Sequence, residues 1–162
     1  MATDASRKSS NPLIGYMTLY GDPSESYFIE ALLIVDIKGY PINYYFTDKI
    51  PVTSIQRVLY GKTLKHYLTE VGGSKLIDNI NEVLSVILVK EKSLVELRKN
   101  IKIPILCVNE QNSGKEGKIE FIAYDDYQED IAKTHQILDI CNSNFDVTEP
   151  FERIRKLLAN PP

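Results

Sequence analysis

Four acidic side chains and one histidine form the group of residues in this sequence that is best suited to chemistry. Asp125, Asp126, Glu129 and Asp130 lie close together, and His135 follows them by a turn or two of an expected helix. Carboxylate oxygens are the ligands that Mg²⁺ and Mn²⁺ prefer, and a histidine beside a carboxylate can take up or release a proton. One interpretation is therefore a metal-dependent enzyme acting on phosphate esters or nucleotides. In it, Asp125, Asp126 and Glu129 bind Mg²⁺ or Mn²⁺ and His135 acts as acid or base.

The same acidic residues also have a purely structural explanation. They follow an expected strand and open an expected helix, and carboxylates in the first turn of a helix are stabilised by the helix dipole and by capping. The two histidines and the two cysteines lack the spacing of a zinc site, and no cysteine or serine lies in a nucleophile elbow. The preferred interpretation is a chain without a metal or cofactor, and catalysis itself is left open.

Lysines and tyrosines supply the candidate binding residues. Lys62, Lys65 and Lys75 flank an expected helix and form a local basic concentration in a chain whose net charge is -3. Such a patch would attract an acidic partner or a phosphate group. Tyr44 and Tyr45 lie in an aromatic strand, which suits either a protein interface or the stacking of bases.

Composition favours a protein that binds other proteins. The chain has ten tyrosines and no tryptophan, and tyrosine is enriched at interfaces. A negative net charge is the wrong sign for gripping nucleic-acid backbones. We predict a non-catalytic interaction or regulatory protein that is a subunit of a larger assembly. Its partner would be another protein or a second copy of the chain, and neither nucleic acid nor a membrane is expected as a partner.

The cysteines and the N-terminal residues predict a cytoplasmic location. Cys107 lies in an apolar run that resembles a buried strand, where a thiol behaves as a small hydrophobic group. A disulfide between Cys107 and Cys141 is left open, but two reduced thiols are preferred. Residues 1–12 lack the apolar segment of a secretory signal, and no apolar run approaches the roughly 20 residues that span a bilayer.

Hydrophobic periodicity predicts an α/β fold, with α+β as the alternative. Strands at 13–20, 27–36 and 42–48 form an antiparallel meander, and Lys38 and Gly39 make the turn between the last two. Helices between 53 and 80 follow. Ile55, Val58 and Leu59 form an amphipathic stripe on the first helix. Gly72 and Gly73 are expected to stop the helix in which they occur.

The second half of the chain is richer in strands. Apolar runs at 83–89 and 103–108, with a short helix at 93–100 between them, predict a parallel pair, although an antiparallel pair is left open. A strand at 118–124 should form a hairpin with 103–108, and two helices close the chain. Residues 1–12 are interpreted as a flexible tail and 13–162 as a single domain, with a possible boundary between 72 and 82.

Overall fold

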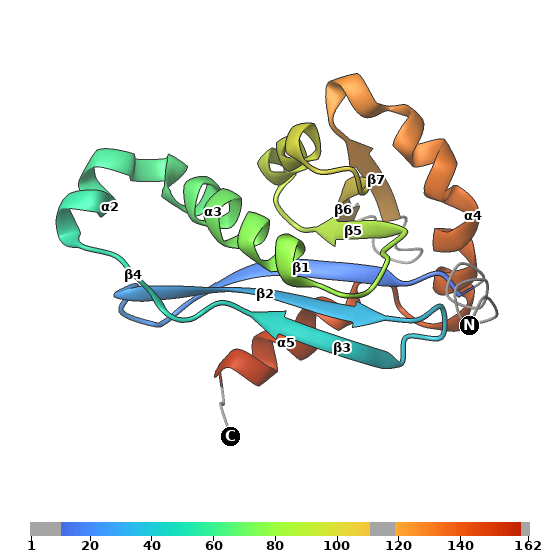
Figure 1. Cartoon of the computed structure of the whole chain (residues 1–162), viewed down its shortest axis with the longest axis horizontal. Coiled ribbons are helices and arrows are strands. Elements are labelled where there is room, and N and C mark those ends of the chain that lie inside the picture. The colour runs from blue at the N-terminus through green and yellow to red at the C-terminus, as the bar shows by residue number, and fades with distance from the viewer. Residues whose placement is uncertain (1–10, 111–118, 160–162) are drawn as a thin grey trace.

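The computed structural model describes residues 11–110 and 119–159, which form a mixed sheet with helices on both faces (Figure 1). The strands are β1 (Ile14–Gly21), β2 (Tyr27–Val35), β3 (Pro41–Phe46), β4 (Ile50–Pro51), β5 (Val86–Val89), β6 (Ile105–Glu110) and β7 (Ile119–Ala123). The helices are α2 (Ser54–Tyr60), α3 (Leu64–Asn79), α4 (Glu129–Asn144) and α5 (Glu149–Ala159). Three 3-10 segments are η1 (Gly61–Thr63), η2 (Lys92–Asn100) and η3 (Asp125–Tyr127). The predicted α/β class is confirmed.

The strand order is β3-β2-β1-β5-β6-β7, and β4 also pairs with β2. β2 is antiparallel to β1 and β3, whereas β5 is parallel to both β1 and β6. The meander, the parallel pair and the hairpin of β6 with β7 are therefore confirmed. After β1 the chain adds β2 and β3 on one side, then crosses through α2 and α3 to β5 on the other side. β1 and β5 are thus adjacent strands at which the chain changes direction across the sheet.

Alternating side chains of β1 divide the core into two layers. Ile14 and Tyr16 point towards α4 and α5, and Met17 points towards α3 and η2. The central strand β5 contributes to both layers and is buried throughout, as expected for a strand covered on both faces. The predicted central strand β2 is likewise buried over most of its length.

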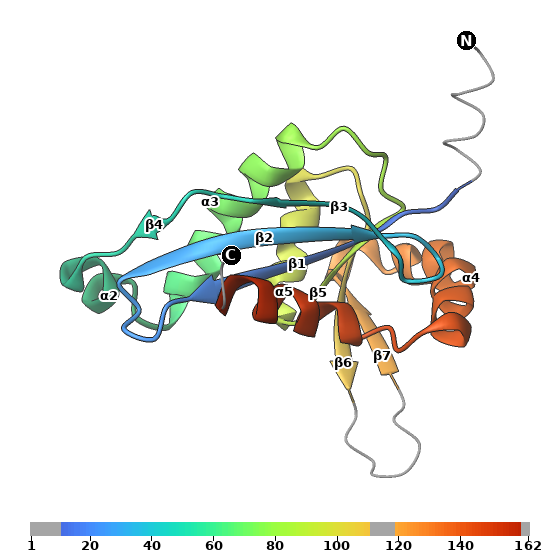
Figure 2. The ribbon, with the colours of Figure 1, turned by 90° about the horizontal axis from the view of Figure 1, so that it is seen from below.

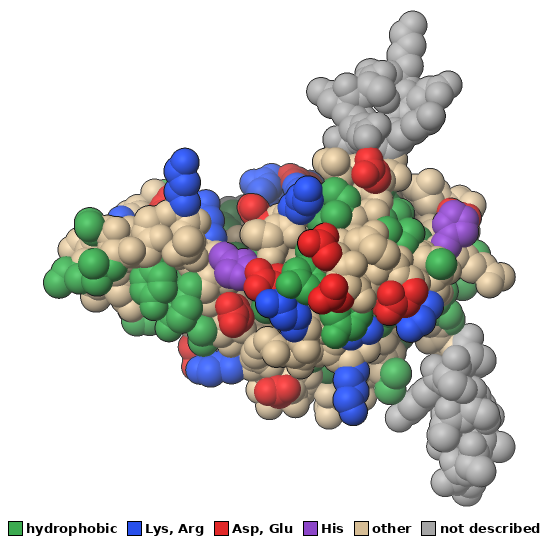
Figure 3. Space-filling view, turned by 90° about the horizontal axis from the view of Figure 1, so that it is seen from above, with side chains coloured by type: hydrophobic (Ala, Val, Ile, Leu, Met, Phe, Trp, Pro, Cys, Tyr) green, Lys and Arg blue, Asp and Glu red, His purple; other side chains and the backbone are tan. Residues whose placement is uncertain are grey.

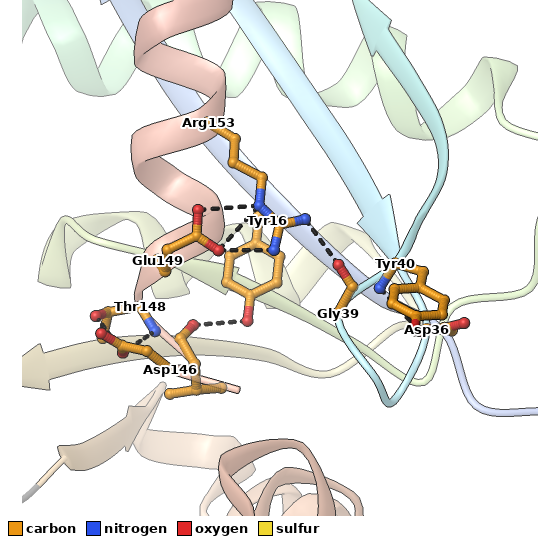
Figure 4. A network of polar contacts seen from close by, with 9 residues as sticks. Tyr16, Asp36, Gly39, Tyr40, Asp146, Thr148, Glu149 and Arg153 are labelled. Atoms are coloured by element: carbon orange, nitrogen blue, oxygen red, sulfur yellow. Dashed lines mark hydrogen bonds and ion pairs between the residues drawn. The ribbon is translucent and has the colours of Figure 1, made fainter. Parts of the chain in front are cut away.

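Helix α5 is fixed to the sheet by a network of polar contacts (Figure 4). The Tyr16 hydroxyl donates to the carbonyl oxygen of Val147 over 2.6 Å, and its ring contacts Phe151 edge-on with the centroids 5.0 Å apart. Burial raises the pKa of Tyr16, so that the hydroxyl remains a donor. Arg153 pairs with Glu149 and donates to the carbonyl oxygen of Gly39 over 2.7 Å. These bonds hold α5 across β1 and β2 (Figure 2).

The prediction that Gly72 and Gly73 stop a helix is wrong, because both glycines lie inside α3. Their role is to let the helix approach the sheet closely. A Cβ atom at Gly72 would lie 2.9 Å from the Cβ of Glu30 on β2, and one at Gly73 would lie 3.1 Å from the Met17 sulfur on β1. The absence of side chains here serves tertiary packing and not the termination of the helix.

The expected stripe on the first helix does not face the core. Ile55, Val58 and Leu59 are 69%, 80% and 78% exposed, and α2 has no buried residue. Hydrophobic side chains accordingly gather at the end of the molecule that α2 occupies (Figure 3). Leu64 and Leu68 of α3 cover Phe28 at this end of the sheet, and of α2 only Tyr60, its last residue, packs against this cluster. At the start of α2, Thr53 and Gln56 form a reciprocal capping box.

The predictions for the cysteines, the N-terminal tail and membrane-spanning segments compare with the structure as follows. Both cysteines are buried and free. The predicted tail lies outside the described residues except for residues 11 and 12. Within the described parts of the chain, no helix is long and apolar enough to cross a membrane.

Candidate functional site

The acidic residues predicted as metal ligands do not converge. Asp125, Asp126 and Glu129 are exposed at the start of η3 and α4. Asp130 instead turns inward, is completely buried and accepts a hydrogen bond from Arg98 Nε over 2.8 Å. Among residues 11–110 and 119–159, no three or more His, Cys, Asp or Glu side chains are grouped so that they could hold a metal ion.

His135 lies away from the start of α4. It follows Glu129 by six residues, which corresponds to about 9 Å along the helix axis and to a rotation of about 240°. Its exposed imidazole pairs with Asp139 on the next turn, with 3.1 Å between Nε2 and Oδ2. The structure therefore does not bring His135 together with Asp125 or Asp126 as an acid–base group.

The three predicted lysines are exposed but do not form one patch. Lys62 lies in η1, and Lys65 and Lys75 lie on α3. Lys65 and Lys75 are separated by ten helical residues, or about 15 Å along the axis. The glycines before Lys75 are helical, so no helix begins there to accept an anion.

The two predicted tyrosines point to opposite faces of the sheet. Tyr45 packs on the side of α3, and its hydroxyl donates to Glu82 over 2.7 Å, which raises the pKa of Tyr45. Tyr44 is on the side of α5, where it is 54% exposed and stacks on Phe46. Only Tyr44 is free to contact a ligand with its ring.

A pocket of about 480 Å³ lies where β1 and β5 end, beside α5. We call it the β1–β5 pocket. In an open α/β sheet, ligands bind at the carboxyl ends of the strands where the chain changes direction across the sheet, and β1 and β5 are that pair. Its lining consists of Thr18, Leu19, Tyr20 and Gly21 of β1, Pro23, Lys90, and Phe151, Glu152, Ile154, Arg155 and Ala159.

The charged side chains of the pocket have a net positive charge. Lys90 directly follows β5, and its ammonium group lies 5.6 Å above the ring of Phe151. Arg155 donates from Nε to Glu152 over 3.1 Å and lowers the pKa of Glu152, with further contributions from Lys156 and Lys90. Glu152 is thus ionised, and two cations face one carboxylate. This arrangement can bind an anion.

These pocket residues were not predicted from the sequence. Thr18, Lys90 and Arg155 are far apart in the chain and meet only because β1 and β5 pair side by side and α5 crosses them. One local signal was present: Lys90 is the first charged residue after a buried strand. A polar residue at that place in a parallel strand marks the edge at which ligands bind.

No protein-family model and no curated protein matches this chain. Several solved structures resemble it at low identity. Endonuclease V of Ciona intestinalis, in complex with a 23mer DNA that contains an inosine followed by a ribo-adenosine, is 11% identical with a TM-score of 0.37, and the match covers 64% of this chain and 47% of that chain. Endonuclease V of Bacillus subtilis is 10% identical with a TM-score of 0.41, and the match covers 62% of this chain and 46% of that chain. Marinitoga piezophila Argonaute in complex with 5' OH guide RNA is 11% identical with a TM-score of 0.43, and the match covers 96% of this chain and 31% of that chain. The chain thus spans less than half of each of these three.

This finding contradicts two predictions. The similar proteins are an endonuclease in complex with DNA and an Argonaute in complex with guide RNA. The prediction of a non-catalytic interaction or regulatory subunit is therefore wrong, and so is the prediction that protein, and not nucleic acid, is the partner. The physical reason for the second error is that a net charge of -3 is a sum over the whole chain. It does not show that Lys90 and Arg155 converge on one pocket.

Proposed function

We propose that the protein binds nucleic acid and holds a backbone phosphate in the β1–β5 pocket. The observation that carries this proposal is the position of Lys90 and Arg155 together at the carboxyl ends of β1 and β5. Phosphate esters or nucleotides were also the substrates of the metal-dependent enzyme considered as one interpretation of the sequence. The proposed site differs from the one predicted there, because the acidic residues at 125–130 and His135 do not converge on one site.

The side chains of the pocket suit a phosphodiester. The ammonium group of Lys90 supplies a compact charge, and the guanidinium of Arg155 supplies a planar set of donors that matches phosphate oxygens. Glu152 orients the guanidinium through its hydrogen bond. The volume of about 480 Å³ lies within the range of small-molecule sites, so there is room for a nucleotide unit.

The proposal concerns binding and does not include a metal-dependent cleavage step. Residues 11–110 and 119–159 offer no set of three or more carboxylate, imidazole or thiol groups for a metal ion. A nucleic-acid ligand agrees with the predicted cytoplasmic location, as do two free and buried thiols. That location stays a prediction.

The test is the affinity of a fluorescently labelled single-stranded oligonucleotide, measured by anisotropy at several salt concentrations. Charge reversal in the variant Lys90→Glu should weaken binding roughly tenfold and reduce the slope of log affinity against log salt by about one. Arg155→Glu should weaken it similarly. The matched control is Lys133→Glu, since Lys133 is an exposed lysine on α4 and away from the pocket. Equal losses in Lys90→Glu and Lys133→Glu would show that only overall charge matters, and the pocket would not be the site.

A further inference from the structure

We infer that Tyr44 and Phe46 on β3 form a stacking platform for the bases of single-stranded nucleic acid. The inference rests on the proposed function and adds to it the part of the ligand that the β1–β5 pocket does not bind. It also names the form of nucleic acid, because the bases of a duplex are already stacked on one another and are not available to protein rings.

The two rings form a parallel pair at the edge of the sheet. Their centroids are 5.8 Å apart with 12° between the ring planes, and Tyr44 and Phe46 are 54% and 52% exposed. In the described residues β3 pairs only with β2, so no described strand pairs with its outer edge. Half-exposed parallel rings present flat aromatic faces, and a planar group can extend their stack.

A groove of about 240 Å³ lies beside the pair, between β3 and α5. Leu157 and Leu158 of α5 form its apolar wall opposite Tyr44 and Phe46. Leu157 is itself 41% exposed. An apolar slot with an aromatic wall suits a flat and weakly polar ligand such as a base.

The groove and the β1–β5 pocket lie on the same face of the sheet, on either side of α5. Ile154 of α5 lines both of them, the pocket together with residues of β1 and Lys90 and the groove together with residues of β2 and β3. The charged residue at the groove, Arg153, is bound both to Glu149 and to the Gly39 carbonyl. In the pocket, by contrast, Arg155 pairs with Glu152 and stays 60% exposed. The groove therefore offers aromatic contact, whereas the pocket offers charge. This division corresponds to the bases and the phosphates of one strand.

The test compares two labelled strands of roughly a dozen nucleotides, one of ordinary sequence and one in which abasic sites replace the bases. The variants are Tyr44→Ala and Phe46→Ala, with Tyr44→Phe as the conservative change. The matched control is Tyr40→Ala, because Tyr40 is an exposed tyrosine of the same hairpin outside the ring pair. Thermal melting verifies that each variant is folded.

We expect Tyr44→Ala and Phe46→Ala each to weaken binding of the ordinary strand about tenfold, with no change for the abasic strand, and Tyr44→Phe to bind as the natural protein does. Equal losses on both strands, or no loss on either, would overturn the platform. A dimer in light scattering that Tyr44→Ala converts to a monomer, with unchanged affinity for the strand, would also overturn it, since the rings would then cover a second copy. If Lys90→Glu weakens binding and the ring variants do not, only this inference fails. If the natural protein binds neither strand, the proposed function fails as well.

Discussion

At the scale of single residues, Glu30 is the side chain whose environment most opposes its ordinary chemistry. It is completely buried where β2 faces α3. Burial raises its pKa well above the ordinary 4.5, and neither carboxyl oxygen has a hydrogen-bond partner among the described residues. Gly72 of α3 lies so close that a Cβ atom there would be 2.9 Å from the Cβ of Glu30. Glu30 is therefore protonated in the folded protein over a pH range in which it is ionised in the unfolded chain.

This difference predicts a pH dependence of stability. The folded state binds the proton more tightly, so the free energy of unfolding should fall as the pH rises from about 4.5 towards the raised pKa. In Glu30→Gln, which has the same shape and cannot ionise, that decrease should be smaller. Urea denaturation at about pH 5 and about pH 8 measures it. Identical pH profiles for the two proteins would show that Glu30 does not titrate differently in the folded state.

At the scale of elements, the ion pair of Arg98 and Asp130 joins η2 to α4. Asp130 is completely buried, and the guanidinium of Arg98 also lies over the ring of Tyr127 at 4.2 Å. Removing one member of a buried pair leaves the other charge without compensation. The variant Asp130→Asn should therefore lower the free energy of unfolding by about 3 kcal/mol.

The neighbouring Glu129 supplies the control for this prediction. It is exposed on the same turn of α4, so Glu129→Gln should change stability by less than about 0.5 kcal/mol. Chemical denaturation of both variants makes the comparison. A small effect of Asp130→Asn would mean that α4 does not depend on η2 for its position.

Helices α2 and α3 should differ in their contribution to stability. The variant with Ile55, Val58 and Leu59 all changed to serine should unfold at nearly the same temperature as the natural protein, since these side chains are exposed. Leu68→Ala, which removes a buried side chain of α3, should cost about 2–5 kcal/mol. Thermal melting tests both. A large loss in the triple variant would show that α2 is packed in solution.

The elements also differ in how far local sequence determines them. The strands of the meander and the parallel pair were predictable, because their apolar runs and turn residues are local signals. The glycines of α3 were misread because the same dipeptide serves as a helix stop or as a close contact with a sheet, and only the partners Glu30 and Met17 distinguish the two. The apolar stripe of α2 has the spacing of an amphipathic helix, but the stripe does not pack on the sheet and no residue of α2 is buried.

At the scale of the whole molecule, the candidate site is a product of topology. Lys90 at the end of β5 meets Arg155 on α5 because the chain crosses from β3 to β5 and later returns over β1 and β2. No local pattern in the sequence contains that information. The acidic group at 125–130 was conspicuous in the sequence, yet it serves to open α4 and to pair with Arg98.

We propose that nucleic acid binds on the α5 face at the carboxyl ends of β1 and β5. The most direct measurement is a titration of the isotope-labelled protein with an unlabelled single-stranded oligonucleotide, followed by amide chemical shifts. We expect the shifts to concentrate at residues 18–21, at Lys90 and at residues 151, 152, 154 and 155, which line the pocket. Shifts confined to the start of α4 near residues 125–135, or no shifts at concentrations where binding is seen by anisotropy, would contradict the claim.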